Sequence, residues 1–272
     1  MKVLYWVPKN LLSFFAGKLM YFKFPKAMSS KLIRLFAQTY HINLNEAEKN
    51  IDDYNSIGDF FTRKLKEGVR PLASSEYVHP ADSKMTARGV IQQNQLIQAK
   101  GKSYLLQNFL GAASLETWTN GFFITYYLCP TDYHRVHSPI EGWIKEVRYI
   151  PGQLWPVNNW SVSNIDELFL KNERVIVEIE STKGPMAVVF VGATNVGSIR
   201  LSFEPALRTN HAHIRSPETW TYPAKSRPIQ KGQELGMFCM GSTVIIVASP
   251  TWTELSKLTQ DSAPQVVQVR SF

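Results

Sequence analysis

Cysteine is scarce in this sequence, which has only Cys129 and Cys239 among its 272 residues. Two cysteines in a chain of this length exclude the disulfide framework that stabilises small secreted domains. Both lie in apolar runs, a setting typical of small buried side chains in a reducing compartment. The alternative for Cys239, a nucleophilic thiol, would require a partner that activates it.

Long apolar runs are also missing. No uninterrupted stretch of about 18 apolar residues occurs, so the sequence predicts no membrane-spanning helix. The first residues do not resemble a signal peptide, because Pro8 and Lys9 interrupt the apolar stretch and no cleavage site of small residues follows. His211 and His213 have the spacing of a metal pair, but no further ligand spacing accompanies them, and we predict no metal site.

Acidic residues are rare in the first 50 positions, which contain two acidic and eight basic residues. The net charge of this segment is therefore +6, out of +8 for the whole chain. Such a concentration of positive charge predicts an anionic partner, either a membrane surface or a nucleic acid.

Three helices are predicted at the N-terminus, over residues 10–24, 29–40 and 56–71. In the first, apolar side chains recur at helical spacing with lysines between them: Leu12, Phe15, Leu19 and Phe22. The first two helices either pack into a core or lie in a lipid interface with their lysines on anionic head groups. Nucleic acid is disfavoured, because the aromatic residues form an apolar stripe instead of standing among basic ones.

From about residue 78 onward, short β-rich runs alternate with glycine, proline and asparagine. The predicted strands are 89–93, 121–128, 143–150, 174–179, 186–192, 198–203 and 244–247, with one helix near 103–110. We therefore predict an α+β protein with two regions. A helical, membrane-associating layer (residues 1–72) lies on a mostly antiparallel β body (residues 73–272) that carries the chemistry.

Three short segments contain residue types that could act together. Asp82 follows Pro80, two histidines three residues apart (His134 and His137) follow a predicted strand, and Ser242 follows a glycine between two β-rich runs. A carboxylate, a histidine and a serine are the parts of a Ser-His-Asp unit: orienting group, base and nucleophile. Each segment alone is equally typical of a turn or a solvated loop.

Seven segments that follow one another along most of the chain resemble the bacterial type of phosphatidylserine decarboxylase. They are residues 60–71 (FFTRKLKEGVRP), 79–85 (HPADSKM), 133–139 (YHRVHSP), 152–158 (GQLWPVN), 172–175 (NERV), 191–199 (VGATNVGSI) and 236–244 (GMFCMGSTV). Each segment is modest evidence by itself, whereas all seven in this order are highly specific.

The resemblance implies a chain that cuts itself. Ser242 would attack the carbonyl of Gly241 to form an ester, and elimination would split the chain between them. Ser242 would become a pyruvoyl group at the start of a 31-residue product, residues 242–272. His137 and Asp82 match the family's processing residues, as base and as the carboxylate that orients the base.

The resemblance also implies what the processed enzyme does. The pyruvoyl carbonyl would condense with the amine of phosphatidylserine and accept the electrons released as carbon dioxide departs, leaving phosphatidylethanolamine. His134 would serve decarboxylation or reprotonation, and Tyr127 would line the substrate pocket. We expect the two products to stay together in a homodimer, peripheral to the anionic cytoplasmic face of a bacterial membrane.

Two positions depart from the family pattern, which has glycine where this chain has Ser83 and leucine where it has Met240. A methionine conserves volume, but a serine would be strained if its backbone needs a positive φ, and self-cleavage would then be slow. Two other functions stay open. One is a non-enzymatic protein that binds anionic lipid, with processing lost through Ser83; the other is a serine hydrolase that uses Asp82, His137 and Ser242 without cutting itself.

Overall fold

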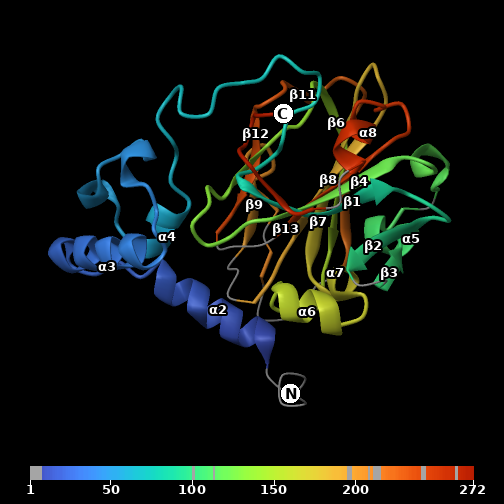
Figure 1. Ribbon diagram of the computed structural model, residues 1–272. Helices are drawn as coiled ribbons and strands as arrows, with labels where there is room; N and C mark the ends of the chain where they lie inside the picture. The colour runs from blue at the N-terminus through green and yellow to red at the C-terminus, as the bar shows by residue number, and fades with distance from the viewer. Residues whose placement is uncertain are drawn as a thin grey trace.

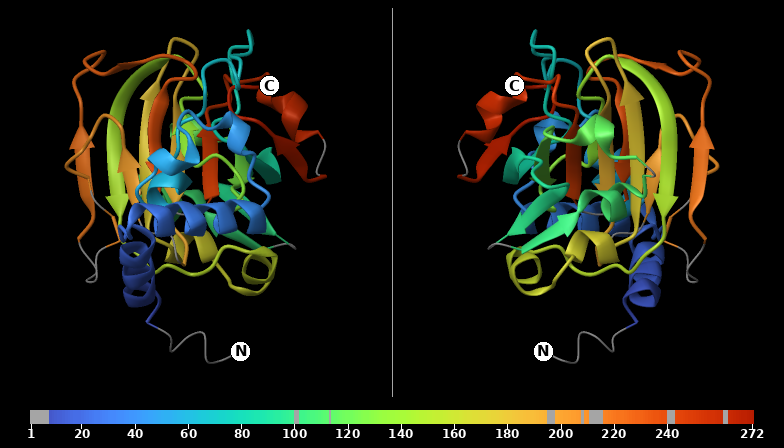
Figure 2. Two further views of the ribbon diagram at one scale, coloured as in Figure 1. Left: turned by 90° about the vertical axis from the view of Figure 1, so that its left-hand side faces the viewer. Right: turned by 90° about the vertical axis from the view of Figure 1, so that its right-hand side faces the viewer.

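The computed structural model describes residues 8–99, 102–112, 114–194, 198–207, 209–210, 216–239, 243–260 and 263–272. It confirms the α+β class (Figure 1). Helices near the N-terminus gather on one side of the β body, and the described N-terminal end lies far from the C-terminus (Figures 1 and 2). None of the helices within the described ranges is long and apolar enough to span a membrane.

The N-terminal layer consists of α2 (Lys9–Met20), α3 (Lys26–Thr39) and α4 (Ile57–Phe61), with two 3-10 turns, η1 (Leu44–Glu46) and η2 (Ile51–Asp53). It has a small core of its own, formed by Ile33, Ala37, Ile42, Tyr54 and Phe60. The helix predicted over 56–71 is too long. It ends at Phe61 because the next residues pair with the segment before η2: Glu48 N–H bonds the Lys64 carbonyl, and Lys66 N–H bonds the Glu46 carbonyl.

The β body is built on a sheet of nine antiparallel strands in the order β10-β6-β7-β8-β13-β4-β1-β14, with β11 paired to β6. Their bounds are β1 (Ser83–Val90), β4 (Phe122–Tyr127), β6 (Gly142–Ile150), β7 (Arg174–Glu180), β8 (Met186–Val191), β10 (Glu218–Thr221), β11 (Pro228–Ile229), β13 (Thr243–Ala248) and β14 (Gln265–Val267).

Two smaller sheets and short helices complete the body. A three-stranded sheet has the order β5-β12-β9, and β2 pairs with β3. The bounds are β2 (Gln95–Ala99), β3 (Lys102–Leu105), β5 (Arg135–His137), β9 (Ile199–Leu201), β12 (Glu234–Phe238), α5 (Leu106–Leu110), η3 (Glu116–Trp118), α6 (Asn159–Asn164), α7 (Leu168–Lys171) and α8 (Leu255–Thr259).

Strand β13 lies in the interior of the large sheet. It pairs over its whole length with β4 on one side and β8 on the other, and all six of its residues are buried. Its continuous β-branched run suits a strand covered on both faces. Burying Val244, Ile245, Ile246 and Val247 contributes about 1.5–3 kcal/mol each, which fixes the strand and, with it, Thr243 at its head.

Two predicted elements near the β2–β3 hairpin are wrong in extent. The strand predicted over 89–93 runs instead over Ser83–Val90, because Gln93 and Asn94 take positive φ and reverse the chain. The helix predicted near 103–110 begins only at Leu106, because Ser103 and Tyr104 pair with β2. The other predicted strands are present within one or two residues of their expected ends.

Candidate active site

A cleft of about 710 Å³ opens where the ends of β1, β4 and β13 meet α6. Its lining includes Lys84, Thr125, Tyr127, Trp160 and Thr243. We call it the Thr243 cleft. Tyr127, predicted to line a substrate pocket, is on its wall, and burial raises the pKa of its phenol. The hydroxyl therefore stays protonated near neutral pH and can donate a hydrogen bond into the cleft.

The predicted cleavage position, Gly241 and Ser242, lies outside the described residues, as do Met240, His211 and His213. The residues on either side are described. Cys239 follows β12, and its backbone N–H donates to the Ser198 carbonyl at 2.8 Å. Thr243 begins β13 opposite Tyr127. Ser242 thus directly precedes, in the chain, a residue of the cleft wall.

His134 is fully buried and uncharged. Its Nδ1–H donates to the Asp132 carbonyl at 2.8 Å, and its ring lies 4.0 Å from that of Phe61. Within the described part of the chain its Nε2 has no hydrogen-bond partner. Burial, aided by the charge of Arg63, lowers the pKa of His134 to about 3. With its proton on Nδ1, the imidazole has a free lone pair on Nε2, the form that a proton acceptor requires.

Arg63 is a buried cation beside this histidine. Its Nη2 donates to the Thr131 carbonyl at 3.3 Å and, weakly, to the Asp132 carbonyl at 3.5 Å. Its Nε and Nη1 find no hydrogen-bond partner among the residues that the structure describes, and burial lowers its pKa. Because Arg63 and His134 both bond the Asp132 carbonyl, the guanidinium fixes the segment that carries the histidine and opposes its protonation.

His137 is held by two hydrogen bonds. Its Nδ1–H donates to the Gly232 carbonyl at 2.8 Å, so its Nε2 accepts from the Tyr133 hydroxyl at 3.2 Å. Burial lowers the pKa of His137, which keeps the ring neutral. His137 and Tyr133 line a second cavity of about 260 Å³, which Arg70 and Glu234 also border. His137 is therefore a neutral base whose Nε2 lone pair already accepts a hydrogen bond from the Tyr133 phenol.

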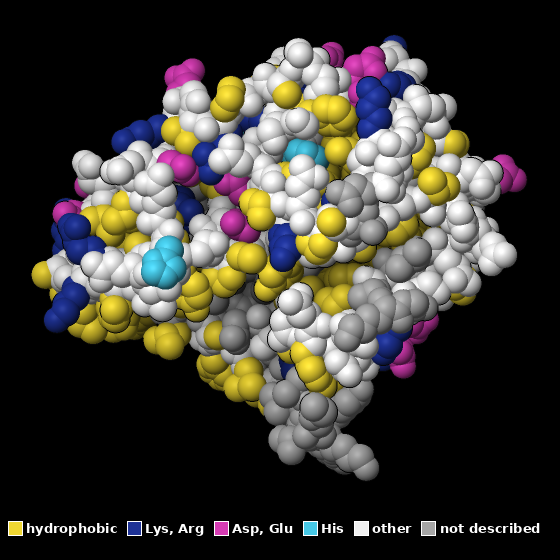
Figure 3. All heavy atoms as spheres, in the orientation of Figure 1, with side chains coloured by type: hydrophobic (Ala, Val, Ile, Leu, Met, Phe, Trp, Pro, Cys, Tyr) yellow, Lys and Arg dark blue, Asp and Glu magenta, His cyan; other side chains and the backbone are white. Residues whose placement is uncertain are grey.

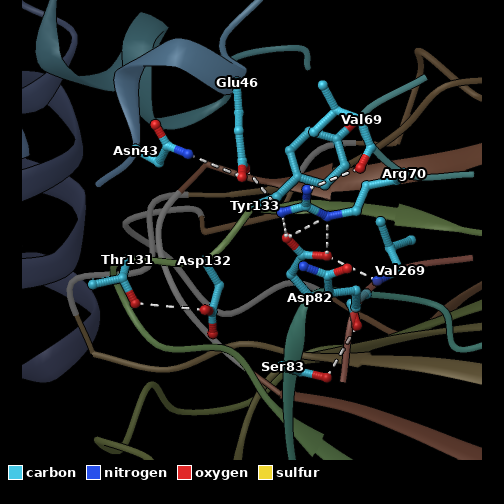
Figure 4. A network of polar contacts seen from close by, with 12 residues as sticks. Asn43, Glu46, Val69, Arg70, Asp82, Ser83, Thr131, Asp132, Tyr133 and Val269 are labelled. Atoms are coloured by element: carbon cyan, nitrogen blue, oxygen red, sulfur yellow. Dashed lines mark hydrogen bonds and ion pairs between the residues drawn. The ribbon is translucent and has the colours of Figure 1, made fainter. Parts of the chain in front are cut away.

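Asp82 belongs to an ion-pair network (Figure 4). Its carboxylate accepts from Arg70 at 2.7 Å (Nη2) and 3.1 Å (Nε) and from the Val269 backbone N–H at 2.8 Å. Arg70 also donates to Glu46 at 2.9 Å. Arg70 thereby joins the N-terminal layer to the start of β1.

The predicted Ser-His-Asp unit is only partly assembled within the described residues. Asp82 and His137 are close along the backbone, since His137 N–H donates to the Pro80 carbonyl at 2.8 Å. Their side chains make no hydrogen bond to each other, because Arg70 and Val269 take the carboxylate while Gly232 and Tyr133 take the imidazole. The triad remains a prediction, which the position of Ser242 would complete.

Ser83 does not carry the strain that a positive φ would impose. It is absent from the residues with positive φ and begins β1 as ordinary strand. Its buried hydroxyl donates to the Ala81 carbonyl at 3.1 Å. The physical reason for expecting slow self-cleavage at this departure is therefore missing.

The two cysteines differ in their surroundings. Cys239 is buried as predicted, and burial raises the pKa of its thiol, which argues against a nucleophilic role. Cys129 is only half-buried and lines the Thr243 cleft. The described residues contain no group of three or more side chains suited to a metal ion.

Three basic residues of these sites were missed in the sequence. Arg63 and Arg70 both lie in the segment 60–71 that carries the family resemblance, which was the one available signal. Lys84 lies in the segment 79–85, which carries the resemblance as well, but nothing there singles it out from its neighbours. Their surroundings come from segments far away in the chain, so composition and spacing do not reveal them.

Comparison with known proteins gives consistent results over most of the chain. The family model described as phosphatidylserine decarboxylase matches residues 57–268. The phosphatidylserine decarboxylase proenzyme of Vibrio cholerae is 40% identical over 249 residues, covering 89% of this chain and 86% of that relative. The proenzymes of Vibrio parahaemolyticus (37% over 271 residues; 97% and 94%) and Herminiimonas arsenicoxydans (38% over 260 residues; 92% and 87%) are similar to it as well.

The burial of His134 predicts how stability depends on pH. Its pKa is about 3 in the folded protein and about 6.5 in an unfolded chain, so between these values only the unfolded chain is protonated there. Through His134, the free energy of unfolding should fall by about 1.4 kcal/mol per pH unit as the pH drops below 6.5.

Denaturant unfolding of the wild-type chain and His134→Gln measures this effect. Their difference in unfolding free energy should shrink by about 2 kcal/mol between pH 6.5 and pH 5. A difference that stays the same across this range would contradict a buried, neutral His134.

Proposed function

The chain belongs to the phosphatidylserine decarboxylase family, and we propose that it converts phosphatidylserine to phosphatidylethanolamine and carbon dioxide after cutting itself between Gly241 and Ser242. The observation that carries the proposal is the position of Thr243. This residue is on the wall of the Thr243 cleft, beside Tyr127, and directly follows Ser242 in the chain.

The described residues fit a pyruvoyl group derived from Ser242. A group carried on the Thr243 nitrogen would lie at the head of β13, at the edge of the Thr243 cleft. The Thr125 and Thr243 hydroxyls on that wall are buried and have no hydrogen-bond partner in the described ranges. A pyruvoyl group supplies a carbonyl that accepts the electrons released on decarboxylation.

His134 is proposed to handle the proton of the decarboxylation. Its carbonyl accepts from the Phe238 N–H at 3.0 Å, which places it beside β12 just before the cleavage position. Among the described residues its Nε2 has no hydrogen-bond partner, and its imidazole is neutral, so the Nε2 lone pair is open to a proton donor. Tyr127 is proposed to orient the substrate in the cleft by donating its hydroxyl proton.

His137 and Asp82 are proposed to serve the self-cleavage. His137 is neutral and can take the Ser242 proton once the Tyr133 hydroxyl moves off its Nε2. Asp82 holds Val269 and Arg70, and thereby fixes the wall against which His137 is packed. The absence of an Asp82–His137 hydrogen bond among the described atoms weakens the hydrolase alternative, which needs a formed triad.

The two products would stay associated because the smaller one is built into the sheet. Residues 243–248 pair with β4 and β8, and β14 pairs with β1. The Arg270 N–H donates to the His79 carbonyl at 2.9 Å, and the His79 N–H donates to the Ser271 carbonyl at 2.8 Å. We also propose a homodimer, on the family resemblance alone.

A membrane-docking surface is proposed on α2, α3 and the turn between them. Its apolar side chains are exposed: Leu11, Leu12, Phe15, Leu19, Phe22, Met28 and Leu35. Hydrophobic side chains gather along the lower left edge of the molecule, where these helices lie (Figure 3). Lys18, Lys23 and Lys26 stand among them, the combination that binds an anionic lipid surface. A peripheral position on the cytoplasmic face of the membrane would follow.

Three substitutions test the self-cleavage and the division of work between the histidines. Ser242→Ala should leave one uncut, inactive chain on a denaturing gel, because the nucleophile is gone. His137→Ala should also block cutting.

His134→Ala should cut normally yet release carbon dioxide at least about 100-fold more slowly, the usual contribution of a general acid–base group. Normal carbon dioxide release by His134→Ala would remove His134 from the mechanism.

Vesicle sedimentation tests the membrane-docking surface. The double substitution Phe15→Glu and Leu19→Glu should weaken binding to vesicles containing phosphatidylserine by at least about tenfold. Two apolar side chains that would insert into the lipid are lost, and two negative charges are added. The matched control is Val266→Glu, which changes an 80% exposed residue of β14, away from the helices. Equal binding by the double variant and the control would refute the surface.

A further inference from the structure

The Thr243 cleft contains a cation that no part of the described chain neutralises. Lys84 is exposed on β1 and lines the cleft, and it forms no ion pair within the described ranges. None of the described lining residues is a carboxylate. Its charge therefore acts on whatever enters the cleft. An exposed lysine elsewhere would simply be solvated, whereas Lys84 borders a cleft whose other described lining residues are uncharged and include apolar ones such as Trp160 and Val162.

Two further groups of the same wall have no hydrogen-bond partner among the described residues. They are the Oγ1 atoms of Thr125 and Thr243, which are buried, and the two residues are 3% and 0% exposed. Buried hydroxyls are nearly always hydrogen-bonded in folded proteins. Both residues line the cleft, so a ligand bound there can supply the missing acceptor.

The sheet places these groups in adjacent rows on one face. Lys84 is directly opposite Tyr127, and Tyr127 directly opposite Thr243. Thr125 lies two residues before Tyr127 on β4, hence on the same face. Neighbouring strands are about 4.8 Å apart, which puts the Lys84 backbone about 10 Å from that of Thr243. The four-carbon stem of lysine spans much of that gap.

We propose that Lys84 binds the phosphodiester of the phospholipid head group. The Thr125 and Thr243 hydroxyls donate hydrogen bonds to the same head group. The inference rests on the proposed function, because a substrate amine held at residue 242 places its phosphate only a few bonds away. Lys84 is then a binding residue for the anion that distinguishes a phospholipid from free serine.

The substrate has two anionic groups, and the chemistry selects the phosphodiester. The carboxylate leaves as neutral carbon dioxide, so a lysine paired with it would stabilise the ground state more than the transition state and slow the reaction. The phosphodiester keeps its charge throughout. A lysine paired with it binds ground state and transition state equally, which lowers KM and leaves kcat unchanged.

Kinetics on the self-cleaved full chain separate these cases. Carbon dioxide release is measured from dioleoyl phosphatidylserine in micelles of a non-ionic detergent. For Lys84→Met, KM should rise about tenfold, the effect of losing one charged hydrogen bond, and kcat should stay within about twofold. Lys84→Arg should restore most of the lost KM. Lys257→Met, the same change at an exposed lysine of α8, is the control and should match wild type.

Soluble competitors identify the group that is bound. Glycerophosphoserine should inhibit wild type and lose about tenfold in potency against Lys84→Met. O-Methylserine, which has the amine and carboxylate but no phosphate, should inhibit both equally. Lys84→Gln is a second variant in case the methionine prevents folding.

Two results would overturn the inference about Lys84: an unchanged KM in both uncharged variants, or a change in kcat with KM unaltered. Cleavage is read separately on a denaturing gel. A wild-type chain that neither cuts nor releases carbon dioxide would instead refute the proposed function, and the role of Lys84 with it.

Discussion

The pairing and burial of β13 within the large sheet hold the candidate site in place. Six buried residues, Thr243–Ala248, pair on both sides, with β4 and with β8. This pairing fixes Thr243 at the edge of a cleft and opposite Tyr127. It also gives the segment that follows the proposed cut a reason to stay in place, because backbone pairing and burial do not depend on the continuity of the chain before residue 242. A scissile bond next to an interior strand can therefore be broken without losing the site.

Electrostatics around the two histidines follow from the same burial. His134 and His137 are both neutral in the folded protein, because desolvation outweighs the hydrogen bonds from their Nδ1 atoms. They differ in what faces Nε2. That of His134 has no partner among the described residues, whereas that of His137 accepts a phenol hydroxyl. The two rings are thus prepared differently, because only His137 must first exchange a partner, and the proposal gives them separate roles in turnover and self-cleavage.

Much of the fold could be predicted from the sequence, because the strands from Phe122 onward have strong β-branched and apolar patterns bounded by turns. Local sequence patterns predicted the wrong secondary structure where pairing with a distant segment determines it. The residues after Phe61 look helical but pair with 46–48, and Ser103 pairs with β2. The roles of the candidate residues came from the family resemblance, which carries no information on their positions in space. It could not show that Arg70 takes the Asp82 carboxylate, nor that Lys84, Tyr127 and Thr243 form one row.

The proposed function rests on self-cleavage before residue 242 and on chemistry at the new chain end. Intact mass spectrometry of the purified wild-type protein, with and without borohydride reduction in the presence of phosphatidylserine, shows whether both occur. We expect two chains, of 241 and 31 residues, and only the smaller should gain the mass of a trapped amine adduct. A single continuous chain that still releases carbon dioxide from phosphatidylserine would contradict it.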